Sequence, residues 1–423
     1  MNSEDRLRKG IRRTEPDRPR PLADAVLRLI WREQRISRAE IARRAALSRS
    51  TASEIVGEIL PTGLVAEGGV GESRGGRRPI VLEFQDESCV IIGVEMGANH
   101  VAAALTDLRG NVLAWESRDH PVRTDPAGSR ALIADLVAAC LASEPHGGKP
   151  LVGIGVAVPS PIDPSRPDAL SKVVLPDWDG RLGLEELQER YGVPLLVDND
   201  ANLGALAEHW WGAGRGVDDF AYIKVATGIG SGHVIGGEIY RGATGVAGEI
   251  GHLAIDPHGE RCICGLRGCL ATLVGGPALV ARAAALRPEY PESPLSSNRP
   301  TVRGIEDGAL AGDPLALRIV REAAEHLGIA VAGLINVMNP SLVVIAGDLA
   351  RVGEPLLEPL REMIKTRTLI SSVAAAEIRA SELGPRSVAV GAATLVLKTA
   401  LSDSRLFPAI AVETEKTAED AAR

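Results

Sequence analysis

Residues 248–269 read GEIGHLAIDPHGERCICGLRGC, and this stretch holds three of the five cysteines in a chain of 423 residues. Cys262, Cys264 and Cys269 lie within eight residues of one another, and His252 precedes the first of them by ten residues. Thiolate and imidazole ligands suit tetrahedral Zn²⁺, and a closed set of four is structural rather than catalytic. The alternative is three reduced surface thiols beside an unrelated histidine. The spacing favours a structural zinc site, in a reducing cytoplasm, over a disulfide framework.

Composition narrows the class of protein. Hydrophobic residues make up 45% of the chain, which is enough to form large cores and excludes global disorder. Aromatic residues make up only 3%, which disfavours the base-stacking surfaces of single-strand binders. No apolar run approaches the roughly 18 residues of a membrane span, so we expect no membrane partner.

Charge is distributed unevenly along the chain. Residues 1–82 hold 17 basic and 11 acidic side chains, whereas residues 83–423 hold 30 basic and 44 acidic ones. A basic N-terminal region before an acidic remainder predicts two parts with different partners, and only the first suits a polyanion.

The basic region predicts a winged helix-turn-helix over residues 21–84, after a charged arm, residues 1–20, that we expect to be disordered. Apolar residues at helical spacing predict a first helix from Leu22, and Ser37 with Glu40 forms a capping box for a second. Ser48 can cap a third helix, which Gly57 and Pro61 should end early or bend. Two short apolar runs, residues 64–65 and 79–82, then flank a glycine-rich segment with a basic end, as a wing would.

This arrangement predicts binding to double-stranded DNA. The third helix of such a motif enters the major groove, and the wing contacts phosphates or the minor groove. The residues expected to contact DNA from the third helix are Arg49, Ser50, Ser53 and Glu54. Those expected to do so from the wing are Arg74, Arg77 and Arg78. The alternative is a small protein-interaction bundle with a solvated basic loop.

The acidic remainder predicts a duplicated α/β fold. Apolar runs at 90–94, 100–106 and 111–116 predict an antiparallel meander, and the pattern returns at 220–225, 233–235 and 238–240 after a glycine-rich turn at 227–232. Helices are predicted over residues 129–142, 203–211, 315–337, 353–366 and 391–400. Two such meanders, one at the start of each half, predict two lobes that share a ligand cleft. We place this domain at 85–402, with lobe 1 at 85–200 plus 385–402 and lobe 2 at 201–384, followed by a loose tail, 403–423.

The motifs of this domain resemble those of the ROK family of repressors, open reading frames and sugar kinases. Besides GEIGH at 248–252 and CICGLRGC at 262–269, they are AVPSP at 157–161, DNDAN at 198–202 and ATGIGSG at 226–232. The resemblance implies a two-lobed, actin-like or ribonuclease H-like ATPase fold with a structural zinc site. The winged helix in front is similar to that of the regulator branch, which includes xylose and N-acetylglucosamine repressors and which the sugar kinases lack.

The resemblance also implies a sugar pocket. Asn199, Asp200, Glu249 and His252 would hold a hexose, and Asp200 would correspond to the general base. The family pocket has a further glutamate where this chain has Ala271. The alternative for Asn199 and Asp200 is a turn that caps the following helix.

The phosphate-binding turns depart from the pattern of the ROK kinases. Their Asp-x-Gly-Gly-Thr turn is Glu95-Met96-Gly97-Ala98-Asn99 here, and their Gly-Thr-Gly begins with Ala226. Their Gly-Gly pair on the adenosine side is Ala346-Gly347. Phosphoryl transfer depends on positioning, so these changes predict no catalytic residue and a vestigial base at Asp200. Glu95 and Asp200 keep their carboxylates, which leaves residual activity open.

Together these patterns predict a cytoplasmic transcriptional regulator, a repressor, controlled by a sugar or sugar-phosphate effector. We expect a homodimer or dimer of dimers, because one helix-turn-helix reads too few base pairs alone. The alternative is an active ATP-dependent sugar kinase with an accessory DNA-binding head. A third hypothesis is that the domain senses a partner protein rather than a sugar.

Overall fold

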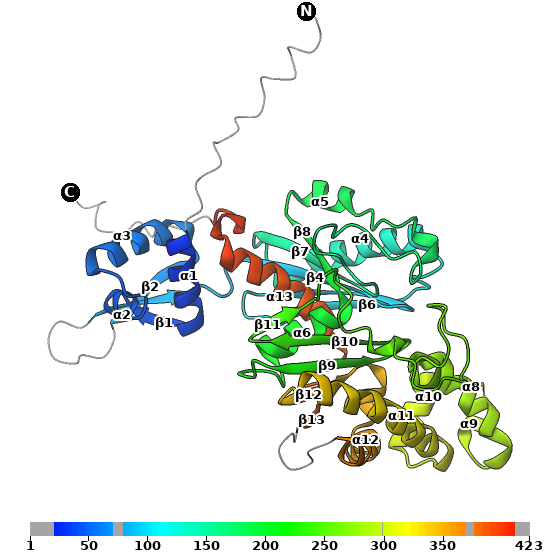
Figure 1. The fold of residues 1–423 in the computed structure, drawn as a ribbon. Helices are drawn as coiled ribbons and strands as arrows, with labels where there is room; N and C mark the ends of the chain where they lie inside the picture. The colour runs from blue at the N-terminus through cyan, green and yellow to red at the C-terminus, as the bar shows by residue number, and fades with distance from the viewer. Residues whose placement is uncertain (1–20, 71–78, 298, 369–375, 411–423) are drawn as a thin grey trace, which may run out of the picture. The chain divides into compact units, whose positions relative to one another are not determined.

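The computed structural model describes residues 21–70, 79–297, 299–368 and 376–410. These residues form two compact units, shown in Figure 1. The described residues up to Ser88, together with those from Lys398 onward, form the first unit, which we call the head. Residues Cys89–Leu397 form the second, which we call the body.

The head has the winged-helix fold that its sequence predicts. Its elements are α1 (Pro21–Glu33), β1 (Arg35–Ser37), α2 (Arg38–Arg44), α3 (Arg49–Ile59), β2 (Val65–Val70) and β3 (Ile80–Phe84). The strands form an antiparallel sheet in the order β1-β3-β2, and the short strand β1 was not predicted. The three helices bury Ile30, Ile41 and Val56 in the head's core.

The helix caps of the head confirm the reading of its sequence. Ser37 and Glu40 form a reciprocal capping box at α2, and the Ser48 hydroxyl accepts a hydrogen bond from the Thr51 amide at α3 (3.1 Å). Helix α3 runs through Gly57 and ends at Ile59, two residues before Pro61, so of the two residues predicted to end or bend it, Pro61 is the one that lies at its end. Buried Val56 and Ile59 fix the last turn, while Gly57 faces open space.

Within the head, the segment from Lys398 to residue 410 packs against α1. The backbone amide of Ser404 donates a hydrogen bond to the Asp24 carboxylate (3.0 Å), and Arg28 donates one to the hydroxyl of Ser402 (3.4 Å). Asp24 and Phe407 are buried. A buried carboxylate needs donors, so the part of the predicted loose tail up to residue 410 is fixed here. Residues 411–423 lie outside the described part of the chain, as do the predicted arm, 1–20, and residues 71–78.

The first half of the body is built on a five-stranded sheet in the order β6-β5-β4-β7-β8. Its strands are β4 (Val90–Met96), β5 (His100–Thr106), β6 (Val112–Asp119), β7 (Leu151–Val158) and β8 (Leu195–Asn199). The antiparallel meander β4–β5–β6 was predicted, whereas β7 and β8, which extend the sheet in parallel, were not. Helices α4 (Pro126–Ala142) and α5 (Glu185–Tyr191) belong to the same half.

The second half repeats this plan in a sheet of order β11-β10-β9-β12-β13. Its strands are β9 (Phe220–Val225), β10 (Ile229–Ile235), β11 (Glu238–Tyr240), β12 (Leu342–Ala346) and β13 (Glu377–Ala380). Each sheet has an antiparallel meander followed by two parallel strands, which confirms the predicted duplication. The predicted turn at 227–232 is mostly strand. Gly230 and Gly232 instead lie in β10. Position 232 requires glycine because a side chain there would collide with the backbone of Ala201.

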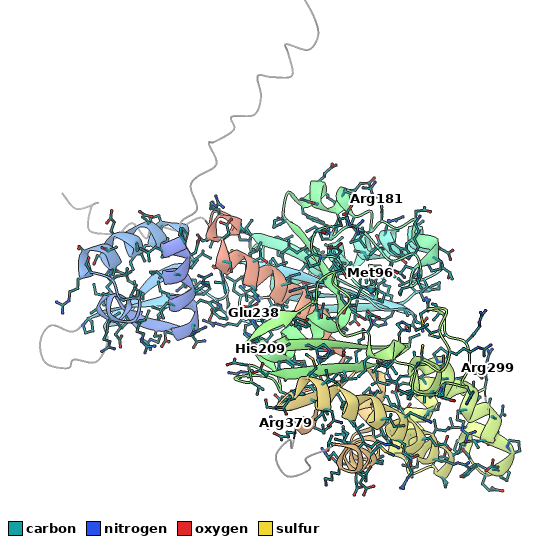
Figure 2. All side chains as sticks on the ribbon, in the orientation of Figure 1. Met96, Arg181, His209, Glu238, Arg299 and Arg379 are labelled. Carbon is teal, nitrogen blue, oxygen red and sulfur yellow. The ribbon has the colours of Figure 1, made fainter. Side chains whose placement is uncertain are left out.

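Helices cover both sheets of the body, as Figure 1 shows. They include α6 (Asp200–Trp211), α7 (Ala271–Val274), α8 (Gly276–Leu286), α9 (Pro294–Ser297), α10 (Val302–Leu310), α11 (Pro314–Met338), α12 (Glu354–Arg367) and α13 (Ser387–Ser402). Gly93 and Gly155 let the backbone of α13 approach β4 and β7 closely. In Figure 2, Met96 at the end of β4 lies inside the body, whereas Arg181 and Arg379 lie at its surface.

Within the described residues, no helix has the length and apolar character needed to cross a membrane.

Candidate functional site

A cavity of 590 Å³ lies in the body, where strand ends of the two sheets meet. The four residues expected to bind a sugar, Asn199, Asp200, Glu249 and His252, all line it. The three phosphate-turn alanines expected to disfavour phosphate binding, Ala98, Ala226 and Ala346, line it too. The structure thus brings the predicted sugar residues and the altered phosphate turns to one cavity, which suits a small polar ligand.

Asn199 ends β8 and caps α6. Its side-chain oxygen accepts hydrogen bonds from the amides of Ala201 (3.0 Å) and Asn202 (3.1 Å), and its amide nitrogen donates to the carbonyl of Ser160 (3.2 Å). The capping alternative raised by the sequence is therefore present in the structure. A ligand would meet an Asn199 whose orientation is already fixed by the backbone.

The corner between β8 and α6 is held by a buried aspartate. Asp198 accepts two hydrogen bonds from the guanidinium of Arg241 (2.6 and 2.9 Å) and one from the amide of Asn199 (2.7 Å). Both guanidinium nitrogens donate to Oδ2, and the backbone amide of Asn199 donates to Oδ1, so both carboxylate oxygens of Asp198 are held. Asp198 therefore positions the start of α6, and with it Asp200.

Sequence reasoning missed Lys224, which lies on β9 between two carboxylates. Its ammonium group donates hydrogen bonds to Glu95 Oε1 (2.8 Å) and Asp200 Oδ2 (2.9 Å). We call these three residues the Lys224 cluster. The one signal in the sequence is a lysine inside the otherwise apolar run of residues 220–225.

The Lys224 cluster controls ionisation at this end of the cavity. Burial alone would raise the pKa of Glu95, but Lys224 and His100 lower it to about 2. Burial would lower the pKa of Lys224, yet Asp200 and Glu95 hold it well above its ordinary value. Hydrogen bonding to Glu95 raises the pKa of His100. Glu95 and Lys224 are therefore both charged near neutral pH.

Glu249 also lines the cavity, close enough to Asp200 for the two charges to interact. Burial and the nearby charge of Asp200 raise the pKa of the Glu249 carboxyl. His252 follows on the short 3₁₀ helix Ile250–His252, with its Nε2 3.8 Å from a Glu249 carboxylate oxygen. Glu249 and His252 thus offer the cavity oxygen and nitrogen groups that suit sugar hydroxyls, which both donate and accept hydrogen bonds.

His252, Cys262, Cys264 and Cys269 come together as predicted, with one ligand atom from each lying within 4.8 Å of all the others. We call this group the Cys/His cluster. Nδ1 of His252 is 3.5 Å from the sulfur of Cys262, and the sulfurs of Cys264 and Cys269 are 3.6 Å apart. The isolated bridges Ala254↔Cys269 and Arg261↔Arg267 fold the connecting loop back on itself. Four donors of this type around one point fit a tetrahedral metal ion.

The two phosphate turns contact each other directly. The side-chain amide of Asn99, after β4, donates a hydrogen bond to the hydroxyl of Thr227, after β9 (3.0 Å). In addition, the ring of His100 lies against Gly97, where a side chain would collide with it. The side-chain amide of Asn99 and the hydroxyl of Thr227 thus bond to each other rather than to a ligand.

In the head, the four residues predicted to contact DNA from the third helix are all exposed on α3: Arg49, Ser50, Ser53 and Glu54. Ala52, Ile55 and Val56 face the core instead. Arg74, Arg77 and Arg78 lie outside the described residues. The head therefore presents an open polar helix face of the kind that enters a major groove.

Comparison with known proteins agrees with this geometry. Residues 91–399 match the ROK family. The xylose repressor of Caldicellulosiruptor bescii is 32% identical over 381 residues, which covers 89% of this chain and 95% of that protein. The crystal structure of a ROK family transcriptional regulator, a homologue of the E. coli Mlc protein, is 26% identical with a TM-score of 0.77, covering 91% of this chain and 97% of that one.

A solved sugar kinase matches a smaller share of this chain. The ROK family glucokinase from Streptomyces griseus, solved with glucose and AMPPNP, is 31% identical with a TM-score of 0.63. The match covers 72% of this chain and 98% of that one, so more than a quarter of this chain has no counterpart in the glucokinase. On the evidence of its motifs, its duplicated fold and the match over residues 91–399, the chain belongs to the ROK family.

Proposed function

We propose that this protein is a DNA-binding transcriptional repressor whose body senses a sugar. The observation that carries the proposal is the union, in one chain, of a winged-helix head with an exposed α3 face and a ROK body. The similarity to a xylose repressor over 89% of the chain supports it, because it extends beyond the body. The protein then acts in the cytoplasm on an operator in double-stranded DNA.

The head supplies the contacts to DNA. Arg49 can donate two hydrogen bonds to guanine, Ser50 and Ser53 suit bases or phosphates, and Glu54 can accept a hydrogen bond from cytosine. Arg74, Arg77 and Arg78 provide positive charge for phosphates or the minor groove. A half-site of few base pairs gives little specificity, so the protein binds a pseudo-palindromic operator as a homodimer or dimer of dimers.

The cavity of the body holds the effector, a sugar or sugar phosphate, through Asn199, Asp200, Glu249 and His252. Support comes from the fact that all four residues line the same cavity. Ala271 also lines the cavity, where the family's pocket has a glutamate. One hydrogen bond to a charged group contributes about 1.5–3 kcal/mol, so this loss weakens or changes sugar selection.

Zinc is the cofactor that best fits the Cys/His cluster. Three thiolates and an imidazole form a closed set of ligands, so the ion stabilises structure and leaves no open position for a substrate. His252 contributes to both regions, because its Nδ1 faces Cys262 and its Nε2 faces Glu249. The metal would therefore fix one wall of the effector cavity.

We infer that the body does not transfer phosphate. The altered phosphate turns, the Asn99–Thr227 hydrogen bond and the Lys224 cluster all support this inference. The second candidate function is an active ATP-dependent sugar kinase, which the similarity to the Streptomyces griseus glucokinase favours. ATP turnover with a panel of hexoses, pentoses and amino sugars separates the two. Rates typical of kinases, about 1–100 s⁻¹, would establish the second candidate.

The DNA-binding role is tested by genome-wide mapping of bound sites, followed by affinity measurements on the recovered operator. Arg49→Ala should weaken operator binding roughly tenfold to hundredfold and binding to random duplex much less. Arg299→Ala, an exposed arginine of the body labelled in Figure 2, is the matched control and should leave the affinity unchanged. Equal affinity of Arg49→Ala and the unmodified chain for the operator would remove this helix face from the interface.

A further inference from the structure

The Lys224 cluster joins residues that are far apart in the chain. Glu95 is on β4 of the first sheet, Asp200 begins α6 after the same sheet, and Lys224 is on β9 of the second sheet. The side chains of Lys224, Glu95 and Asp200 are only 12%, 4% and 15% exposed. The ammonium group thus links the two halves of the body across the end of the cavity.

Two carboxylates that meet at one point inside a protein need a cation. Without one, their repulsion and loss of hydration force one of them to take up a proton. Glu95 Oε1 and Asp200 Oδ2 lie 2.8 and 2.9 Å from the same nitrogen atom, so Lys224 supplies that charge. Carboxylate oxygens converging on one point are also the ligands that Mg²⁺ prefers. Here the chain itself fills that point.

Each carboxylate oxygen of Asp200 already accepts one hydrogen bond. Oδ2 accepts a hydrogen bond from Lys224 (2.9 Å), and Oδ1 accepts one from the amide of Ala201 (2.8 Å). A carboxylate held in this way can still accept from a ligand hydroxyl with a remaining lone pair. It is oriented to bind, and its negative charge is already shared with a neighbouring cation.

We propose that Lys224 is a built-in counter-cation for the Glu95–Asp200 carboxylate pair, taking the place that a divalent cation would otherwise fill and tying the two sheets together across the cavity. The two halves of the body would therefore be held together at this point without a metal–nucleotide complex. The consequence for ligand binding rests on the proposed sensor function: Asp200 recognises a hydroxyl without removing its proton. The Asn99–Thr227 hydrogen bond also joins the two halves of the body, because Asn99 follows β4 and Thr227 follows β9.

The test is a double-mutant cycle on the full chain, read by thermal unfolding. Lys224→Met leaves two unbalanced carboxylates, so we expect the melting temperature to fall by about 5–10 °C. Glu95→Gln alone should also lower it. In the Lys224→Met background, however, Glu95→Gln should raise the melting temperature, because it removes the unbalanced charge. Lys172→Met, at an exposed lysine outside the cavity lining, is the matched control and should change little.

A second arm uses Mg²⁺ alone as the probe. Lys224→Ala opens space at the shared point, so millimolar Mg²⁺ should raise the melting temperature of that variant. It should not do so for the unmodified chain or for Lys224→Ala with Glu95→Gln. If Glu95→Gln lowers stability equally with and without Lys224, or Mg²⁺ affects all three proteins alike, the proposal is wrong. Neither result depends on DNA or sugar, so the repressor function stands or falls separately.

Discussion

In the Cys/His cluster, four donor atoms from residues 252–269 surround a point, whereas in the Lys224 cluster two carboxylates from residues 95 and 200 surround the ammonium of residue 224. The first set has the ligands of a zinc ion and would take its cation from outside. The second set has the ligands of a harder cation, yet the cation that it holds, the ammonium group of Lys224, belongs to the chain itself. The difference teaches where the body would depend on a metal ion: in the loop that carries the Cys/His cluster, and not between Glu95 and Asp200.

Removal of a zinc ligand should give the largest effect. Cys264→Ser breaks the closed set, so we expect loss of about one Zn²⁺ per chain and a fall in melting temperature of roughly 10 °C or more. Because the rest of the body has its own core, the product should be a loosened protein rather than a random coil. Metal analysis and thermal unfolding measure both.

His258→Ala is the control for that change, because His258 is an exposed residue of the same loop and lies outside the cluster. It should retain zinc and stability. A chain purified without chelators that contains no zinc, with Cys264→Ser as stable as the unmodified protein, would show that the Cys/His cluster binds no metal. The contrast between the two clusters would then disappear.

The next effect concerns pH and the Lys224 cluster. The pKa of Glu95 is about 2 in the folded protein against an ordinary value of 4.5, so its stabilising contribution is present above pH 4.5 and is lost as the pH falls toward 2. The linkage corresponds to about 3 kcal/mol. The difference in free energy of unfolding between the unmodified chain and Glu95→Gln should therefore shrink as the pH falls from 5 to 3. A constant difference would contradict the charge-balance account.

His100 should contribute with the opposite sign of pH dependence. Its pKa is raised by the hydrogen bond to Glu95, so its contribution is complete below its ordinary pKa of 6.5 and is lost as the pH rises through the higher value of the folded state. His100→Gln should therefore cost stability at pH 6 and little at pH 9. Denaturant unfolding at the two pH values, with Glu95→Gln as the reference, measures this difference. An equal cost at both values would assign His100 a packing role alone.

The smallest effect should come from Asn99, which joins the two phosphate turns. Asn99→Ala removes one exposed hydrogen bond to Thr227, so we expect a loss of about 0.5–1 kcal/mol. Thr227→Val should cost a similar amount, and the two together should cost less than their sum. Full additivity of the two changes would show that the hydrogen bond does not hold the turns together.

The two clusters also show what the sequence could and could not predict. The Cys/His cluster is local, so its spacing predicted both the residues and their convergence. The Lys224 cluster requires knowing that β9 lies against the end of β4 and the start of α6, which is a property of tertiary packing. The same reason accounts for the glycines of β10: their pattern is typical of a turn, but close approach to Ala201 requires them within a strand.

Helices with strong caps and periodic apolar faces, such as α2, α3 and α11, were predicted to within a few residues. Strands β7, β8, β12 and β13 were missed. Strands β7 and β12 are buried on both faces and therefore lack an alternating pattern, whereas β8 and β13 are short. In the candidate site, family resemblance placed Asn199 and Asp200 in the cavity wall, but the contacts that fix them come from Ser160, Ala201 and Lys224.

The most direct test of the central proposal, a sugar-sensing repressor, is operator affinity measured with and without sugars. The recovered operator duplex is titrated with the full chain in the presence of pentoses, hexoses, amino sugars and their phosphates. We predict that one of these classes lowers the affinity at least about tenfold in the unmodified chain and has no effect in Asp200→Asn, with no ATP consumed. Operator affinity that no sugar changes, together with ATP-dependent phosphorylation of a sugar at kinase rates, would contradict the proposal.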